Sequence, residues 1–370
     1  MAYNPEQRAD LRRACTTIFS GHTPLKPGEE FIRIGEWCRE NDFDADVYGA
    51  GKLLNSFESK VAKLLDKPAA TFMPSGTMAQ QIAIRIFSDG AKNLTVGMHP
   101  TCHLEIHEQK GYEFLHGLKS WHVGDRTKPI AACDVANLAQ QLAALVLELP
   151  AREIGGQLPT WDELSAIKAA CIKRGIKLCL DGARLWETGA FYQRSYATIC
   201  AGFDSVYVSF YKGIGGLAGA MLLGDADFIA EAKIWQRRQG GNLVQLHPYV
   251  ASAAMKFDER IARMPAYFER AQQFAESISG VEGIMINPKA VQANMLHLHF
   301  SVSVAALEAA RDQIAAEDKC WLGNPRDASD VPGWSSMEIY VGENLMALND
   351  DFIVKHFTKC LALAKKFNHE

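Results

Sequence analysis

Short apolar runs bounded by turn residues recur along the first two thirds of the chain. In order they read NLTVGM, AALVLELP, IKLCLDG, SVYVSF and AGAMLLG. Runs of this kind are typical of buried strands. Between them, apolar residues recur at helical spacing, as in GTMAQQIAIRIF at 76–87 and in the stretch 53–65. The pattern therefore predicts strands that alternate with helices.

One of the predicted helices has clear ends. TWDELSAIKAACIKRG lies between AALVLELP and IKLCLDG, with Thr160 placed to cap its start and Gly175 placed to end it. A helix between two buried strands forms a crossover unit, so we expect a mostly parallel sheet that is covered on both faces. In such sheets, functional sites gather at the carboxyl ends of the strands.

The pattern changes after about Gln245. Long helical stretches follow, then the short strands ANMLHLHFSV and SMEIYV, and a last helix that begins at Asp350. This part is typical of a second, smaller α+β region. We expect a large domain at 26–255 and a small domain built from 1–25 and 256–370, with the N-terminal segment packed against the C-terminal part.

Composition narrows the class of protein. With 370 residues, of which 48% are hydrophobic, the chain can bury a large core. The net charge of −4 leaves no basic surplus for phosphates, and the Lys and Arg residues are scattered, so nucleic acid is not an expected partner. No stretch has the apolar length of a membrane span, and the N-terminus lacks the apolar core of a signal peptide. We therefore expect no membrane partner.

The nine cysteines point to a reducing compartment. Their number is odd and none are spaced as CxxC, so the sequence predicts neither a disulfide framework nor a zinc site. HLEIH at 103–107 has the look of a metal motif, but its spacing is not HExxH, and we expect no metal. A cytoplasmic location fits these features best.

A single lysine stands out in the stretch SVYVSFYKGIGGLAG. Lys212 follows two aromatic residues and precedes a cluster of glycines between two predicted strands. An apolar setting disfavours the charged amine and lowers its pKa, which makes the neutral amine a nucleophile toward carbonyl groups. The alternative is an exposed lysine at a strand end, with glycines that only turn the chain.

Two further stretches suit the same chemistry. Asp181 ends the apolar run KLCLD, and a carboxylate at a strand end can pair with the protonated ring nitrogen of pyridoxal phosphate (PLP). TFMPSGTMAQQ places Ser75, Gly76 and Thr77 at the start of a helix, where free N–H groups and the helix dipole favour a phosphate. Taken singly, Asp181 also fits a turn and Ser75 an ordinary helix cap.

The order of phosphate turn, acidic strand end and lysine strand end resembles that of the threonine aldolase and β-eliminating lyase family of fold-type-I PLP-dependent enzymes. The resemblance covers about 46–227 and continues more faintly to the C-terminus. The stretches that carry it are DVYGAGKLLNSFESKVAKLLDKPAATFMPSGTMAQQIAI, CHLEIHEQKG, LELPAREIGGQLP, LDGARLWETG and SFYKGIGGLAGAMLLGD. It implies an α/β, aspartate aminotransferase-like large domain, a small α+β C-terminal domain, and PLP as the cofactor.

The resemblance also implies roles for the matching residues around the cofactor. Lys212 would form the Schiff base with PLP, and Asp181 would pair with the pyridine nitrogen. Gly76 and Thr77, with Ser75 beside them, would hold the phosphate.

The remaining matches concern the ring, the substrate and a neighbouring subunit. His103 would stack on the cofactor ring, or else be a packed core histidine. Arg184 would contact the cofactor and hold the carboxylate of an amino-acid substrate, which suits its bidentate geometry. Tyr48 would reach the active site of a neighbouring subunit, and Arg237 belongs to a stretch that resembles the intersubunit cofactor loop of the family. We therefore expect a homodimer or homotetramer with shared active sites.

The substrate side departs from the family pattern. Ala151 takes the place of a histidine that is a candidate for handling the β-hydroxyl proton. Ser20 is the only residue left of the usual N-terminal motif, and Glu338 stands where a second carboxylate-binding arginine is expected. Arg152 would replace that lost charge at the substrate, or instead form a surface salt bridge with a neighbouring glutamate.

The expected function is that of a PLP-dependent lyase that cleaves the Cα–Cβ bond of a β-hydroxy-α-amino acid into an aldehyde and glycine. With Ala151 in the usual place, the general base would be His103, His107, Glu153 or a water. The alternatives are β-elimination or another Cα–H reaction on the same cofactor, and a catalytically silent PLP-binding protein. The sequence leaves the substrate and the stereochemistry at Cβ open.

Overall fold

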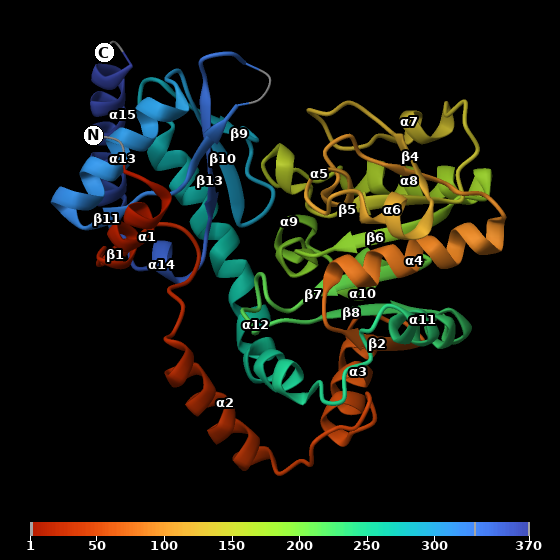
Figure 1. The fold of residues 1–370 in the computed structure, drawn as a ribbon. Coiled ribbons are helices and arrows are strands. Elements are labelled where there is room, and N and C mark those ends of the chain that lie inside the picture. The colour runs from red at the N-terminus through yellow and green to blue at the C-terminus, as the bar shows by residue number, and fades with distance from the viewer. Residues whose placement is uncertain (1–2, 329–330, 369–370) are drawn as a thin grey trace. The chain divides into compact units, whose positions relative to one another are not determined.

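The computed structural model describes residues 3–328 and 331–368 (Figure 1). The chain forms two compact units. The larger one spans Leu25–Met264, and the smaller one combines Met1–Pro24 with Pro265–Glu370. The boundary between the units falls inside the long helix α12 (His247–Ile278). No helix within the described ranges is both long and apolar enough to cross a membrane.

The larger unit is built on a seven-stranded sheet with the order β2-β8-β7-β6-β5-β3-β4. Only β8 runs antiparallel to its neighbours, and the other pairs are parallel, so the predicted mostly parallel sheet is confirmed. The strands are β2 (Ala69–Met73), β3 (Thr95–Met98), β4 (Lys119–His122), β5 (Ala144–Glu148), β6 (Lys177–Gly182), β7 (Ser205–Ser209) and β8 (Ala220–Gly224).

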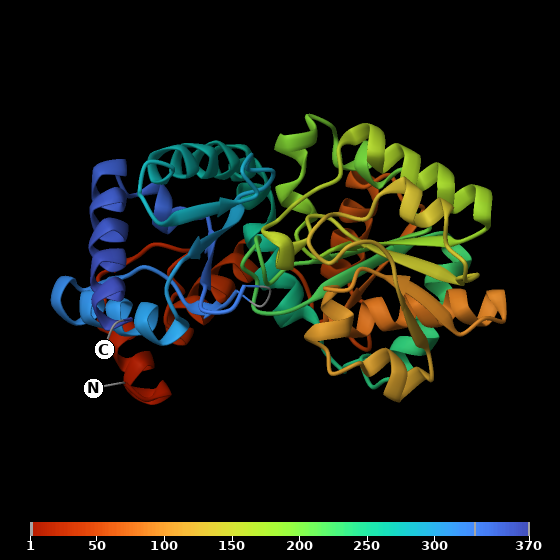
Figure 2. The ribbon, with the colours of Figure 1, turned by 90° about the horizontal axis from the view of Figure 1, so that it is seen from above.

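Helices cover both faces of this sheet, as the continuous apolar runs of its central strands require. Figure 2 shows α4 (Gly76–Ala91) on one face and α8 (Trp161–Arg174) on the other. The other helices of this unit are α2 (Pro27–Asn41), α3 (Lys52–Leu64), α5 (His103–Ile106), α6 (Gly111–His116), α7 (Ala132–Ala136), α9 (Gly189–Tyr192), α10 (Tyr196–Cys200) and α11 (Ala226–Arg238), with the 3-10 turns η1 (Arg152–Ile154) and η2 (Leu185–Glu187).

The ends of α8 are those that the sequence predicts. Thr160 Oγ accepts a hydrogen bond from Glu163 N at 3.2 Å, which satisfies one of the free N–H groups of the first turn. Gly175 adopts the left-handed conformation, with φ of +64°, and ends the helix.

The smaller unit contains an antiparallel sheet with the order β12-β13-β10-β9. The N-terminal segment joins this unit, because β1 pairs with β11 in parallel, with Thr17 opposite Cys320. The elements are α1 (Pro5–Arg13), β1 (Thr17–Ile18), β9 (Ile284–Asn287), β10 (Met295–Phe300), α13 (Val304–Asp318), β11 (Cys320–Trp321), β12 (Pro325–Asp327), β13 (Ser335–Tyr340), α14 (Glu343–Met346) and α15 (Asp350–Phe367).

The direction of the strands brings distant parts of the sequence to one edge of the large sheet. β3, β5, β6 and β7 run parallel, and β2 points the same way because it is antiparallel to β8. Their carboxyl ends therefore lie at the same edge. The residues that follow these ends are the candidates for a functional site.

Candidate functional site

Lys212 lies in the tight loop that joins β7 to β8. The carbonyl of Phe210 accepts a hydrogen bond from Gly216 N at 2.7 Å, which closes the loop around the lysine. A Cβ atom on Gly216 would lie 3.0 Å from that same carbonyl oxygen, so the close approach favours glycine. Helix α12 anchors the loop, since Ser252 Oγ accepts from Leu217 N at 2.9 Å. These contacts hold the loop that carries Lys212.

Lys212 and Asp181 share a buried environment. Burial lowers the pKa of the Lys212 amine, and the charge of Asp181 opposes that shift. Burial likewise raises the pKa of Asp181, which is only 2% exposed, while Lys212 and a hydrogen bond from Ala183 N at 3.0 Å work in the opposite direction. The structure therefore brings together the amine and the carboxylate that the sequence selects.

Asp181 stands in a row with two other polar residues. In the register of the parallel strands, Glu148 on β5 lies beside Asp181 on β6, which lies beside Tyr207 on β7. Burial raises the pKa of Glu148 to about 7, and the charge of Asp181 acts in the same direction. A hydrogen bond from Arg152 N to Glu148 Oε1 at 3.0 Å and the charge of Lys212 limit the shift.

The predicted phosphate turn begins α4. Ser75 is the N-cap, and its Oγ accepts a hydrogen bond from Met78 N at 3.3 Å. Gly76 is the first residue of the helix, and a Cβ atom there would overlap the hydroxyl oxygen of Tyr207. Burial and the charge of Asp181 raise the pKa of that hydroxyl well above its usual range, so it remains a donor. Thr77 is exposed at the same helix end.

His103 is the first residue of α5, which follows the carboxyl end of β3. Its Nδ1 lies 2.9 Å from Oε1 of Glu108, whose side chain is almost fully buried. A carboxylate only accepts, so Nδ1 carries the proton, and Nε2 is the unprotonated nitrogen of the neutral ring. Gln81 Nε2 supports the arrangement by donating to Glu108 Oε2 at 3.4 Å.

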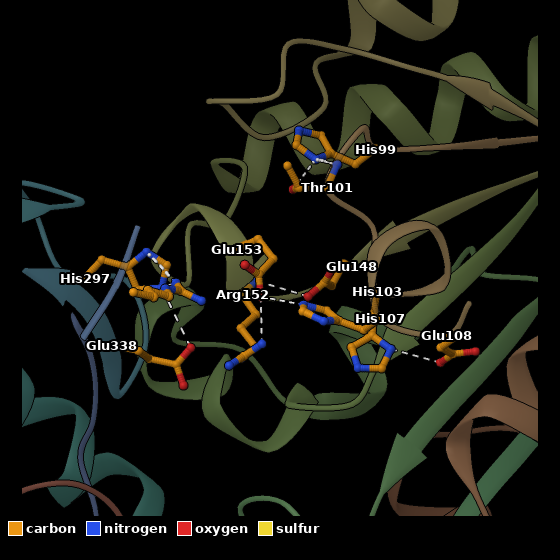
Figure 3. A network of polar contacts seen from close by, with 11 residues as sticks. His99, Thr101, His103, His107, Glu108, Glu148, Arg152, Glu153, His297 and Glu338 are labelled. Atoms are coloured by element: carbon orange, nitrogen blue, oxygen red, sulfur yellow. Dashed lines mark hydrogen bonds and ion pairs between the residues drawn. The ribbon is translucent and has the colours of Figure 1, made fainter. Parts of the chain in front are cut away.

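A second histidine lies beside the first. The ring centroids of His103 and His107 are 5.1 Å apart. His107 Nε2 lies 3.0 Å from Glu153 Oε1, and Arg152 Nη1 approaches the same oxygen to 2.6 Å (Figure 3). Arg152 therefore forms the salt bridge with Glu153 that the sequence offered as an alternative to substrate binding.

Arg184 lies close to the lysine as well. It precedes η2, and its Nη1 is 3.3 Å from Oε1 of Glu187, a fully buried carboxylate in the same turn. The charge of Arg184 lowers the pKa of Lys212. Because the charge of Arg184 is felt at Lys212, the same charge can attract a carboxylate to this site.

Tyr48 and Arg237 form a separate cluster on the surface. Tyr48 is 57% exposed, with φ of +48°, and its N–H donates to Val244 O at 2.9 Å. Asn242 links the two residues when its amide is turned. Its nitrogen then donates to Tyr48 O at 3.1 Å, and its oxygen accepts from Arg237 Nη2 at 3.2 Å. All three residues line a hollow of about 490 Å³.

Two residues singled out by the sequence belong to the smaller unit. Ser20 Oγ accepts a hydrogen bond from Tyr340 N at 3.0 Å and lies 3.2 Å from Tyr340 O. Glu338 lies on β13 opposite His297, with 3.8 Å between Oε2 and Nε2. Within 3–328 and 331–368, no three His, Cys, Asp or Glu side chains are grouped as metal ligands.

The sequence pattern did not identify Glu148, Glu108 or Tyr207 as site residues. Glu148 stands at the end of an apolar strand as Asp181 does, and the same rule applied to AALVLE would have selected it. No comparable signal marks Glu108, which is identified only by its contact with His103.

The residues present fit the PLP that the resemblance implies. Asp181 is a buried carboxylate whose cost of burial a cationic ring nitrogen would offset. α4 is a helix of 16 residues whose start offers free N–H groups beside the Tyr207 hydroxyl, a suitable environment for a phosphate. Lys212 supplies an amine whose pKa is lowered by burial.

Comparison with known proteins agrees with this geometry. Residues 39–301 match the family described as beta-eliminating lyase. A solved structure described as a putative L-allo-threonine aldolase from Listeria monocytogenes is 39% identical, covers 97% of this chain and 99% of its own, and superposes with a TM-score of 0.88. A putative aromatic amino acid beta-eliminating lyase/threonine aldolase from Exiguobacterium is also 39% identical, over 95% of this chain and 99% of its own, with a TM-score of 0.87.

A curated relative is more distant. The low-specificity L-threonine aldolase 1 of Arabidopsis thaliana is 26% identical over 267 residues, which are 70% of this chain and 74% of that protein. The structural matches cover nearly the whole chain and confirm the predicted fold-type-I architecture.

Proposed function

Because the chain belongs to the beta-eliminating lyase family, we propose that it is a PLP-dependent enzyme that cleaves the Cα–Cβ bond of a β-hydroxy-α-amino acid into an aldehyde and glycine. One observation carries the proposal: the half-buried Lys212 beside the buried Asp181 at the carboxyl edge of the sheet, next to the cationic Arg184. The names of the similar proteins, which include a putative L-allo-threonine aldolase, favour the same reaction.

Each group of the site has a part in binding the cofactor. Lys212 would supply the amine that holds PLP, and Asp181 would accept a hydrogen bond from the protonated pyridine nitrogen. Ser75, Gly76 and Thr77 hold the phosphate at the start of α4. His103 covers the ring, with its orientation set by Glu108. When bound, PLP withdraws electrons from the Cα atom of the amino acid.

The protein residues also select the substrate. Arg184 binds the α-carboxylate, since its charge affects Lys212 more than that of Arg152 does. Arg152 contributes less, because its Nη1 lies 2.6 Å from Glu153 Oε1, closer than the 3.3 Å between Arg184 Nη1 and Glu187 Oε1.

A second reaction, β-elimination, is favoured by one observation. Ala151 occupies the place where the family has a histidine, and a methyl group cannot accept the proton of a β-hydroxyl. Cleavage requires removal of that proton, whereas release of a leaving group from Cβ does not. The absence of the histidine therefore favours elimination.

We further propose a homo-oligomer with shared sites. Tyr48 and Arg237 are both exposed and lie in one cluster with Asn242. Exposed aromatic and guanidinium groups held in a fixed arrangement suit a contact with the active site of a neighbouring subunit.

Product analysis tests the proposed reaction. The purified protein, loaded with PLP, is incubated with L-threonine, L-allo-threonine and L-phenylserine, and separately with amino acids that carry a leaving group at Cβ. We expect an aldehyde and glycine from the first set. Keto acid and ammonia from the second set, with no aldehyde from the first, would show elimination instead. Lys212→Ala should abolish turnover, whereas Lys119→Ala, at an exposed lysine, should not.

A further inference from the structure

The cleavage reaction needs a group that takes the proton of the β-hydroxyl. Ala151 is the N-cap of η1, shortly after the end of β5 at Glu148, and its side chain has no group that can exchange a proton. The base must therefore come from another element at this edge of the sheet. The candidates are the polar side chains near His103 and Lys212.

His107 has the geometry of an oriented base. It follows the last residue of α5, and its Nε2 lies 3.0 Å from Oε1 of Glu153. Because a carboxylate only accepts, the hydrogen of this contact resides on Nε2, and Nδ1 of the neutral ring retains its lone pair. The carboxylate thus fixes the tautomer and the orientation, as it does in hydrolases that use a histidine base.

The surroundings of His107 also suit this task. Its ring centroid is 5.1 Å from that of His103, which places it next to the residue expected to cover the cofactor. The side chain is 39% exposed, so a substrate that enters from solvent can reach it. Figure 3 shows both rings together, with Glu108 bonded to His103 and Glu153 bonded to His107.

The other candidates are less suitable. Glu153 Oε1 already accepts from His107 and from Arg152. His103 has Nδ1 bonded to the buried Glu108 and is expected to cover the ring. Glu148 Oε1 accepts from Arg152 N, and its carboxylate lies beside Asp181 in the sheet.

We propose that His107, positioned by Glu153, is the general base of this enzyme and replaces the histidine that the chain lacks at Ala151. This inference rests on the proposed cleavage reaction. In the reaction, the β-hydroxyl proton passes to Nδ1 of His107 while the Cα–Cβ bond breaks. The electron pair of that bond remains with the Cα fragment, and the Cβ–O bond becomes the carbonyl of the aldehyde. A proton then adds to Cα and gives glycine.

The same site can carry out two reactions that differ in their need for His107. Exchange of the α-protons of glycine with solvent deuterium involves Cα but no β-hydroxyl. His107 is therefore needed for cleavage and not for exchange. Lys212 is needed for both.

The test compares wild-type holoenzyme with His107→Asn and with His122→Asn, a control at an exposed histidine of β4. The cleavage substrate is the β-hydroxy amino acid that the wild type cleaves best. Exchange is followed by NMR with glycine in deuterium oxide, and PLP content by absorbance. We expect His107→Asn to lower kcat for cleavage about 100-fold or more, with exchange within about threefold of wild type, and His122→Asn to change neither.

Chemical rescue and Glu153 provide further readouts. Added imidazole should restore part of the cleavage activity of His107→Ala, because the half-exposed site admits a small base. Glu153→Gln keeps an acceptor but loses the charge, so we expect kcat for cleavage to fall about tenfold, with KM and exchange unchanged. A purely structural role of either residue would reduce cleavage and exchange together, without rescue.

The possible failures are distinguishable. A wild type that exchanges glycine protons but cleaves no β-hydroxy amino acid would overturn the proposed function and this inference with it. A wild type that cleaves, together with a His107→Asn variant that cleaves at the same rate, would overturn only the role of His107. Equal losses of cleavage and exchange in His107→Asn would overturn it as well.

Discussion

Glu148 lies directly beside Asp181 in the parallel register of β5 and β6. Two carboxyl groups at the buried end of neighbouring strands repel each other when both are ionised. Burial and this repulsion raise the pKa of Glu148 to about 7 from its usual 4.5, whereas the charge of Lys212 favours the ionised form. The site therefore combines one amine with two carboxyl groups whose protonation depends on one another.

The raised pKa of Glu148 predicts a pH-dependent effect of Glu148→Gln on stability. Between pH 4.5 and about 7, the folded state binds more protons at this group than the unfolded state, so its contribution to stability falls as the pH rises. Above this window, the ionised Glu148 lowers the free energy of unfolding by at most about 3 kcal/mol. Glutamine avoids this cost and still offers an oxygen to Arg152 N.

We therefore expect the melting temperature of Glu148→Gln, relative to wild type, to increase from pH 5 to pH 8. Thermal unfolding of both proteins without added PLP at the two pH values measures this difference. A difference that stays constant with pH would show that Glu148 ionises normally in the folded protein.

Asp181→Asn tests the partner of the ring nitrogen. An amide cannot stabilise a protonated pyridine as a carboxylate does, so we expect kcat to fall by about two orders of magnitude or more, with PLP still bound. Activity and PLP content are measured together, with Asp162→Asn at an exposed position of α8 as the control. A kcat close to that of wild type would remove Asp181 from the mechanism.

Two glycines of α4 provide a matched pair of variants. A Cβ atom at Gly76 would overlap the Tyr207 hydroxyl, whereas a Cβ atom at Gly90 would meet nothing within 4 Å. We expect Gly76→Ala to weaken PLP binding at least about tenfold, because either Tyr207 or the first turn of α4 must move. Gly90→Ala should leave PLP binding unchanged and add up to about 1 kcal/mol of stability. Titration with PLP compares them, and equal affinities would contradict a phosphate site at the start of α4.

Mixing two inactive variants tests whether subunits share sites. Tyr48→Phe lacks the hydroxyl that we expect to act in the neighbouring subunit, and Lys212→Ala lacks the amine. A hybrid dimer of the two should contain one site with both intact groups, so activity should return after mixing. Exchange of differently tagged subunits is verified in the same samples by pull-down, and each variant alone must be strongly impaired. Exchange without return of activity would exclude the shared site at Tyr48.

The amino-acid sequence by itself determined the local elements and much of the cofactor side of the candidate site. The spacing of apolar residues predicted the strands and helices, Thr160 and Gly175 predicted the ends of α8, and the glycines around Lys212 predicted the β7–β8 loop. These features depend on interactions between residues close in sequence, such as caps and tight turns, so the sequence pattern alone reveals them. The strand-end rule also identified Asp181.

Only the tertiary structure decided which side chains meet. Strand β8 lies between β2 and β7, and the register that aligns Glu148 with Asp181 follows from how whole strands and helices pack. The contact between His107 and Glu153 joins residues 46 positions apart, on turns after β3 and β5. Periodicity shows which face of a strand is buried but does not specify its neighbour, because strand order and register are set by long-range packing. For that reason the sequence left His103, His107, Glu153 and water as equal candidates for the base, whereas the structure orients His107 through Glu153.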